Sequence, residues 1–363
     1  MKLLMPFFRS PKNLWFLVGV VLILKILFFL YLTLLFEGNL FGGGNDANYY
    51  HAYAVGYVNN AVNFWPVMLR FLNEINFYNR DLLSFVLFVN SVTLMPYLYY
   101  KLVKDRDYSI KPVKAGAVLL IVFYPTIFFL TIDVYRDVFM FTMVLLSFWI
   151  YKIILESGKW KGSIYFFIFL SVAYFLFLLR PYLGAVLALT PFVYLIFLKT
   201  KRYIKTWIFL YFLALVLAKV LGLIDPILDY RGESGFESGG SSLGIGLINA
   251  DPFMFLVYYL YSFFVQLFGL FFISFIAILV FIFESMPFIF ALFYVFKNIR
   301  FVTKFAGFLL VFFVIYSTVW LLGNDNLGTA TRLRVPGYLA IFACMFIVYQ
   351  EKVKFNFNKI NRG

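Results

Sequence analysis

The stretch "LWFLVGVVLILKILFFLYLTLLF" (residues 14–36) contains a single charged residue, Lys25. A transmembrane helix needs about 20 mostly apolar residues, so this run is long enough to cross a bilayer. Basic residues precede it at Lys2, Arg9 and Lys12, and no small-residue cleavage site follows it. We therefore interpret it as a retained first membrane helix, in which Lys25 should face other helices or water.

The rest of the chain has the same apolar character. Hydrophobic residues make up 64% of it, charged residues make up 13%, and the mean hydropathy is +0.91. Soluble globular domains contain roughly half apolar and a quarter charged residues. These values predict an all-α, polytopic membrane protein, organised as a single integral membrane domain over residues 1–363.

Short basic clusters separate the apolar segments in alternate pairs. Ten segments are candidate spans: 13–36, 82–100, 115–131, 138–153, 163–179, 183–198, 206–223, 269–296, 303–322 and 336–350. If every basic cluster lies inside, as the positive-inside rule requires, both termini are cytoplasmic. The same clusters account for the net charge of +14, which therefore does not indicate a nucleic-acid partner.

This topology predicts five outer segments: 37–81, 132–137, 180–182, 224–268 and 323–335. In the first, apolar residues recur at helical spacing, which predicts amphipathic helices lying flat at the membrane surface. The residues that carry this pattern are Trp65, Met68, Leu69, Leu72 and Ile75. The fourth is rich in Gly and Ser up to residue 251, and 251–266 should form a helix at the outer interface.

The outer segments contain arginine and no lysine. Their arginines are Arg70, Arg80, Arg136, Arg180, Arg231, Arg332 and Arg334. The planar guanidinium suits bidentate recognition of phosphate or carboxylate, which favours an anion-binding site. Arg136 lies in "IDVYRD" (132–137), where Asp133 and Asp137 should hold it towards the anion. The alternative is that lysine is merely excluded from the outer face and that these arginines form structural salt bridges.

The stretch "GGGNDANYYHAYA" (42–54) contains the candidate acid–base residues. On a helix, Asp46 and Tyr50 share a face because they lie four residues apart. Asp46 is either a general base for a hydroxyl group or the N-cap of that helix. His51 either assists or is a hydrogen-bonded structural residue. Further along the chain, Asp133 and Asp137 are rival bases, and Asp325 is a weaker one.

Two other features concern buried charge and metals. Glu284 falls inside a predicted span and should form a structural pair with Lys25 or Lys219, although intramembrane charges of this kind also occur in transporters. One cysteine, Cys344, and one histidine, His51, leave no basis for a disulfide or for a metal site built from His and Cys. We predict no cofactor, and a divalent metal stays open.

Several stretches resemble known membrane enzymes. The acidic residue followed by "YYHAYA" in the first outer segment resembles the GT-C class of membrane glycosyltransferases. The stretches "YPTIFFLTIDVYRDVFMFTMVLLSFWIYK" (124–152), "LLRPYLGAVLALTP" (178–191) and "NLGTATRLRVPGYLAI" (326–341) resemble parts of bacterial O-antigen and capsular polysaccharide polymerases. The large C-terminal outer domain of many GT-C enzymes is absent from this chain, which favours the polymerase.

This resemblance implies a GT-C-like fold and glycosyl transfer at the outer, periplasmic face of the bacterial inner membrane. The substrates would be saccharide repeat units linked to undecaprenyl diphosphate, with a chain-length regulator and a flippase as possible partners. Arg136, Arg180, Arg332, Arg334 and Tyr50 would bind the substrate. Catalysis would fall to Asp46, with His51, Asp133 and Asp137 as rivals. Two alternatives stay open: a GT-C transferase that uses a polyprenyl-monophosphate sugar, and a flippase or transporter of lipid-linked saccharides.

Overall fold

The computed structural model describes residues 10–34, 44–104, 110–200, 204–233, 242–247, 249–272 and 274–360. These residues are mainly helical and form no strand, apart from one isolated bridge between Ser242 and Asn326. Six helices are long and apolar enough to cross a membrane, or seven if one bent pair counts as a single span. The chain therefore has the helices of a multi-pass membrane protein, as predicted. The Gly-rich start of the first outer segment and residues 234–241 lie outside the described residues.

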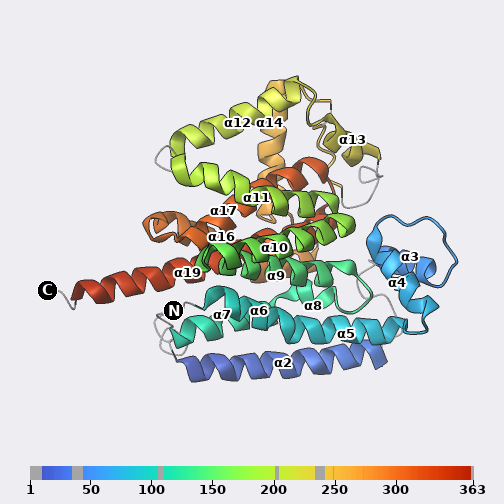
Figure 1. The fold of residues 1–363 in the computed structure, drawn as a ribbon. Helices are drawn as coiled ribbons and strands as arrows, with labels where there is room; N and C mark the ends of the chain where they lie inside the picture. The colour runs from blue at the N-terminus through green and yellow to red at the C-terminus, as the bar shows by residue number, and fades with distance from the viewer. Residues whose placement is uncertain are drawn as a thin grey trace. The chain divides into compact units, whose positions relative to one another are not determined.

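The chain forms two compact units, and the first is discontinuous in sequence. Unit 1 comprises residues 1–185, 298–306 and 343–363, and unit 2 comprises 186–297 and 307–342. The helices that lie wholly in unit 1 are α2 (Pro11–Leu34), α3 (Gly44–Ala54), α4 (Phe64–Glu74), α5 (Arg80–Val92), α6 (Leu94–Val103), α7 (Lys111–Phe123), α8 (Pro125–Phe129), α9 (Arg136–Glu156) and α10 (Lys159–Leu179) (Figure 1).

Unit 2 contains shorter helices and two π-helical turns. Its complete elements are α12 (Ile204–Val220), α13 (Asp225–Glu233), α14 (Pro252–Ser262), η3 (Phe263–Leu267), α15 (Phe275–Val280), η4 (Phe281–Ser285), α16 (Met286–Lys297) and α18 (Leu327–Leu333). Three helices contribute to both units: α11 (Pro181–Thr200), α17 (Lys304–Gly323) and α19 (Val335–Ile360). Each of the ten predicted spans overlaps a helix, and the count of ten membrane crossings stays a prediction.

Proline sets a helix boundary at two points that matter for the site. The predicted span 115–131 is divided into α7 and α8, because Pro125 lacks an N–H and Tyr124 before it leaves the helical conformation, with φ −56° and ψ 112°. Likewise, Pro181 begins α11 and Arg180 before it is extended, with φ −152° and ψ 97°. The charged side chain of Arg180 therefore lies at the corner between two helices.

This corner closes tightly because residue 184 is a glycine. A Cβ atom on Gly184 would overlap the backbone nitrogen of Phe177 and the carbonyl oxygen of Ala173, both on α10. Backbone atoms in a packed helix cannot move aside cheaply. We expect Gly184→Ala to lower the unfolding temperature markedly, whereas Gly158→Ala, where nothing lies within 4 Å, should have little effect. Thermal unfolding of the detergent-solubilised variants checks this, and equal stability would contradict the tight corner.

The first outer segment contains helices α3 and α4, and α4 carries the apolar pattern that predicted a helix there. Helix α4 buries Trp65 and Leu69 and exposes Phe71, so it is amphipathic. Helix α3 buries Ala47 and Tyr50. Figure 1 shows both helices beside the end of unit 1 where α5 and α9 begin. They thus cover the end of the helix bundle that holds the predicted site.

Candidate functional site

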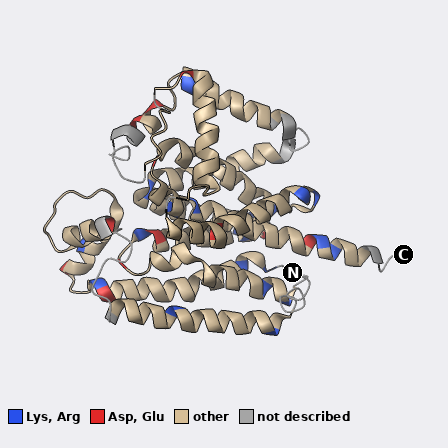
Figure 2. Ribbon diagram, turned by 180° about the vertical axis from the view of Figure 1, so that it is seen from behind, with Lys and Arg blue, Asp and Glu red and all other residues tan. Residues whose placement is uncertain are grey.

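Five of the predicted site residues come together at the start of α9, and we call them the Tyr50 cluster: Asp46, Tyr50, Arg136, Asp137 and Arg180. Helix α3 supplies the first two, α9 supplies the next two, and the corner before α11 supplies the last. The four charged members are close enough to act electrostatically on the Tyr50 phenol. Figure 2 shows that charged residues of the described chain gather mostly near helix ends.

Tyr50 is the buried centre of this cluster, with 4% of its surface exposed. Burial raises the pKa of its phenol above the ordinary value of 10.0. The positive charge of Arg136 opposes that rise, and the negative charge of Asp46 adds to it. The phenol is therefore protonated at neutral pH and can donate a hydrogen bond to a phosphate oxygen or to a sugar oxygen.

Arg180 and Asp137 form a buried ion pair. Nη2 of Arg180 lies 3.3 Å from Oδ1 of Asp137, and their side chains are only 7% and 2% exposed. The guanidinium also lies over the ring of Tyr182, at 5.8 Å from its centroid. Because a buried charge is tolerated only when it is paired, each residue neutralises the other. The pair fixes the α10–α11 corner against the start of α9.

Arg136 is placed differently. Its Nη1 donates to the carbonyl oxygen of Leu179 at 2.9 Å, and among the described residues it forms no ion pair. It is half-buried and is the first residue of α9, where the unsatisfied N–H groups of the helix add positive potential. A guanidinium has five N–H donors, and one carbonyl leaves most of them for a ligand. Arg136 is thus the member best suited to bind an anion.

The turn "IDVYRD" is held by residues that precede it in the chain. Arg80 donates to both carboxylate oxygens of Asp133, at 2.9 and 2.6 Å, and to Asn48 Oδ1 at 2.7 Å. The indole N–H of Trp65 donates to the carbonyl of Val134 at 2.9 Å. Asp133 therefore pairs with Arg80 and Asp137 with Arg180. The expectation that both hold Arg136 was wrong, because each carboxylate has another arginine beside it.

His51, also on α3, is close enough to the Arg80–Asp133 pair to interact with it electrostatically. Its Nδ1 is 3.0 Å from the hydroxyl of Tyr78, and burial raises the pKa of Tyr78 to about 12. Burial also lowers the pKa of His51 from its ordinary value of 6.5, and the positive charge of Arg80 lowers it further. The imidazole is therefore held in its neutral form beside a phenol. This matches the alternative in which His51 is a hydrogen-bonded structural residue.

We expect His51 to titrate below 6.5 in the folded protein. Because the folded state favours the neutral imidazole, its contribution to stability is complete above about pH 6.5 and is lost as the pH falls below that value. Histidine-labelled NMR gives a single signal, since this is the only histidine in the chain. Arg80→Gln should raise the His51 pKa by removing a nearby positive charge. A wild-type pKa at or above 6.5 would contradict this environment.

The remaining predicted residues belong to unit 2. Arg334 and Glu284 form an ion pair with Nη2 3.5 Å from Oε2, and both side chains are 0% exposed. The prediction that Glu284 pairs with Lys25 or Lys219 was therefore wrong. Lys219 lies 3.3 Å from Asp225, and Lys25 lies over the ring of Phe128. The burial of Arg334 argues against its predicted role in binding substrate.

The other two unit 2 candidates have different surroundings. Arg332 is half-buried in the last turn of α18, and its role in binding substrate stays a prediction. Asp325 is fully buried and accepts hydrogen bonds from Ser242 Oγ at 2.8 Å and from the N–H of Gly244 at 3.0 Å. Asp325 therefore holds the loop segment at residues 242–244. This structural role agrees with its place as the weakest of the candidate bases.

Sequence reasoning did not predict the contacts that Arg80, Asn48, Trp65 and Tyr78 make around the site. All four precede a predicted span or lie on an amphipathic helix, and their partners are distant in the chain, so no spacing pattern reveals them. Within the described ranges, no group of three or more His, Cys, Asp or Glu side chains lies close enough together to hold a metal ion. No family model, curated protein or solved structure is significantly similar to this chain.

Proposed function

We propose that this protein is a membrane glycosyltransferase that polymerises saccharide repeat units linked to undecaprenyl diphosphate. The observation that carries the proposal is the Tyr50 cluster, where Arg136 presents a positive charge at a helix N-terminus beside a carboxylate and a protonated phenol. A leaving group of concentrated negative charge suits this arrangement. The apolar helices support a lipid-linked substrate, whose phosphate would lie at the depth of the helix ends.

In the proposed reaction, a hydroxyl group of the acceptor saccharide attacks the anomeric carbon of the donor. The bond between that carbon and the diphosphate oxygen breaks, and the diphosphate leaves with the bonding electron pair. Asp46 takes the proton of the hydroxyl as general base, and Arg136 stabilises the negative charge on the diphosphate. Tyr50 donates a hydrogen bond to the same phosphate group or orients the sugar. The Arg180–Asp137 pair positions Arg136 through the Leu179 carbonyl.

The proposed topology has ten spans, with both termini cytoplasmic and the Tyr50 cluster at the periplasmic face of a bacterial inner membrane. Two features support it. The α5–α6 run Arg80–Val103 and helix α9 both begin at this face and are apolar enough to cross the bilayer. The outer segments, including those of the cluster, contain arginine and no lysine. A fold of the GT-C type belongs to the same proposal.

The test is the surface polysaccharide of the native bacterium after deletion of the gene and its return on a plasmid. Loss of long chains, with a single repeat unit still attached to its acceptor, is the result expected for a polymerase. A ladder of normal length that lacks one sugar would instead indicate a side-branch transferase, for which a polyprenyl-monophosphate sugar is the donor to test. An unchanged ladder would overturn the proposal.

A second candidate function is favoured by the buried pair in unit 2. Charged residues within membrane helices often mark a transport path, and Glu284 and Arg334 are fully buried near the η4 turn. This observation would suit a flippase for lipid-linked saccharides. In the deletion strain, a flippase predicts loss of all repeat units from the surface, with lipid-linked units accumulating on the cytoplasmic side. The two functions therefore give different ladders.

A further inference from the structure

Helix α4 is tied at both ends to helices that are long and apolar enough to cross a membrane. Near its start, the indole N–H of Trp65 donates to the carbonyl of Val134, two residues before α9 begins. After its end, five residues lead from Glu74 to Arg80, the first residue of α5. A chain extends by at most about 3.5 Å per residue, so both ends of α4 lie near the points where α5 and α9 begin. Helix α4 therefore runs along the membrane surface at this end of unit 1.

The turn that ends α4 presents an aromatic ring to the outside. The N–H of Phe77 donates to the carbonyl of Leu72 at 2.8 Å, and the N–H of Asn76 donates to the carbonyl of Asn73 at 3.0 Å. Asn76 has φ 58°, in the left-handed region that asparagine tolerates better than most residues. Many helices end in this pattern, and the residue at the position of Phe77 frequently packs back against the helix. Phe77 is instead 75% exposed.

The circumference of α4 is divided among three kinds of side chain. Trp65 and Leu69 are buried against the protein. Arg70, Asn73 and Glu74 lie three or four residues apart and form a polar face. A third face is apolar and exposed, with members four residues apart along the helix. We call this face and the exposed ring that follows it the outer stripe: Val67, Phe71, Ile75 and Phe77. A helix that lies between protein, water and lipid needs three faces of these kinds.

The exposed apolar surface continues beyond the outer stripe into α5. Leu82, Phe85 and Val86, in the first two turns of that helix, are also exposed. They belong to the candidate span Arg80–Val103, and in a bilayer the exposed apolar side chains of a span face lipid. Phe77 precedes that span by only three residues. The outer stripe is thus continuous along the chain with a lipid-facing surface.

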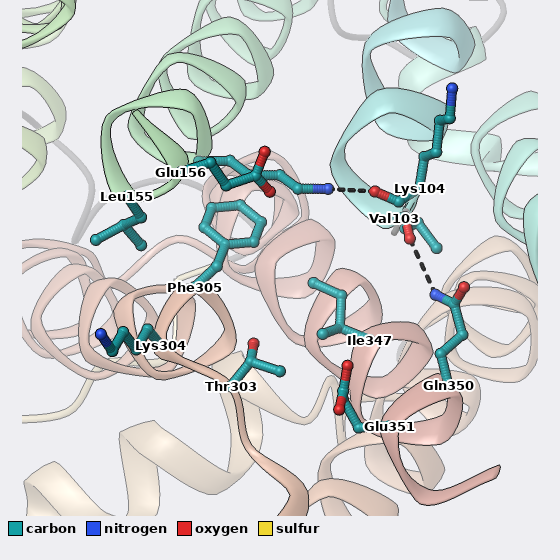
Figure 3. Close-up of a pocket in the computed structure, with 11 residues that line it drawn as sticks. Val103, Lys104, Leu155, Glu156, Thr303, Lys304, Phe305, Ile347, Gln350 and Glu351 are labelled. Atoms are coloured by element: carbon teal, nitrogen blue, oxygen red, sulfur yellow. Dashed lines mark hydrogen bonds between the residues drawn. The ribbon is translucent and has the colours of Figure 1, made fainter. Parts of the chain in front are cut away.

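The opposite end of unit 1 has the kind of surface expected in water. A cavity of about 200 Å³ lies there, lined by the C-terminal ends of α6 and α9, the start of α17 and part of α19. The three exposed residues of its wall are all charged: Lys104, Glu156 and Lys304 (Figure 3). Helix ends in this unit therefore do not carry exposed apolar side chains by default, and the outer stripe marks a surface that a partner covers.

We propose that this partner is the bilayer itself, and that α4 inserts the outer stripe among the lipids of the leaflet at which α5 and α9 begin. The polar face of α4 then meets water, while Trp65 and Leu69 hold the helix to unit 1. The stripe shares only Ile75 with the apolar pattern that predicted a helix at the membrane surface, because Trp65 and Leu69 of that pattern are buried in protein. No member of the stripe is charged, so the attachment depends on apolar burial and does not need anionic lipids. This inference does not depend on the proposed catalytic function.

The test is the accessibility of nitroxide spin labels on the full chain in phosphatidylcholine vesicles. Cys344, the single cysteine of the chain, is fully buried and is first removed by Cys344→Ala. Phe71→Cys then places a label on the outer stripe, and Asn73→Cys places a matched label on the polar face. We expect the ratio of collisions with oxygen, which concentrates in lipid, to collisions with a water-soluble nickel chelate to be several-fold higher at 71 than at 73. Equal ratios at the two positions would overturn the proposal.

Three additions cover misfolding and the other possible occupants of the outer stripe. Val67→Cys labels a second member of the stripe and should behave as Phe71→Cys does, so the test survives if one variant does not fold. Adding phosphatidylglycerol to the vesicles should leave the ratios unchanged, and a high ratio that requires this anionic lipid would contradict apolar insertion. Dilution with unlabelled protein should leave the spectrum at 71 unchanged. Line broadening that disappears on dilution would show that the stripe contacts a second copy of the chain, and would overturn the proposal.

Discussion

Arg136→Lys is expected to lower glycan chain extension about 100-fold while the protein still accumulates in the membrane. Lysine keeps the positive charge and can still reach the Leu179 carbonyl, but it lacks the planar fork that binds two phosphate oxygens together. Loss of one preorganised donor to a developing negative charge typically costs 100- to 1000-fold in rate. The measurement is the rate of chain extension on purified lipid-linked repeat units, in proteoliposomes with matched protein content.

Arg70→Lys is the matched control for this experiment. Arg70 is likewise an arginine of an outer segment, the first one, but it lies over the ring of Tyr53, at 4.3 Å, and donates to the carbonyl of Val58 at 3.3 Å. It is not a member of the Tyr50 cluster, so its replacement should leave chain extension within a few-fold of the wild type. Equal activity in Arg136→Lys and the wild type would exclude a bidentate phosphate site at Arg136. Equal losses in both variants would indicate a general effect of replacing an outer-segment arginine.

Breaking the buried pair of unit 2 should have the largest effect on stability. Removing one partner of a buried ion pair typically destabilises a protein by about 3–5 kcal/mol, because the other charge stays buried without compensation. Glu284→Gln should be worse than Arg334→Met, since a lone glutamate can take up a proton whereas a guanidinium cannot lose one. Thermal unfolding in detergent, followed by tryptophan fluorescence, measures the difference.

The double variant Glu284→Leu/Arg334→Met should be closer to the wild type than either single variant, because no unpaired charge is left. Lys219→Gln is the control, since its partner Asp225 is 48% exposed and such pairs contribute little. A double variant as unstable as the sum of the two single variants would show that the two residues contribute independently, which would contradict a coupled pair. Single variants with wild-type stability would contradict the buried placement.

Membrane helices were predictable from the sequence because hydrophobicity in a bilayer leaves few alternatives to a helix. The breaks were harder to predict. The division at Tyr124 was not predicted, although Pro125 explains it, and nothing in a hydropathy pattern predicts the π-helical turns at 263–267 and 281–285. Those turns depend on which side chains pack across the unit, as when the Tyr338 hydroxyl donates to the Leu267 carbonyl and contacts Ser285 Oγ.

The sequence predicted which residues belong to the candidate site better than it predicted which of those residues form ion pairs. Charged residues at the edges of membrane spans tend to lie at the membrane surface. The predicted topology alone could therefore place Asp46, Arg136 and Arg180 on one face. Which carboxylate meets which arginine depends on helix rotation and on corners such as Arg180–Pro181, and these are tertiary properties. The same reason explains the wrong partner for Glu284, since Arg334 is 50 residues away in the chain and reaches it only through the packing of unit 2.

The discontinuous sequence of unit 1 has a consequence for synthesis on the ribosome. Its later parts emerge out of turn: 298–306 follow the first part of unit 2, and 343–363 follow all of it. Until then the Val103 carbonyl lacks the Gln350 amide that donates to it at 2.9 Å, and Gly116 lacks the neighbouring ring of Phe346. The nascent first unit must therefore wait in the bilayer, incomplete, while the second is inserted. A premature stop near residue 340 would thus damage the earliest helices as well as the last.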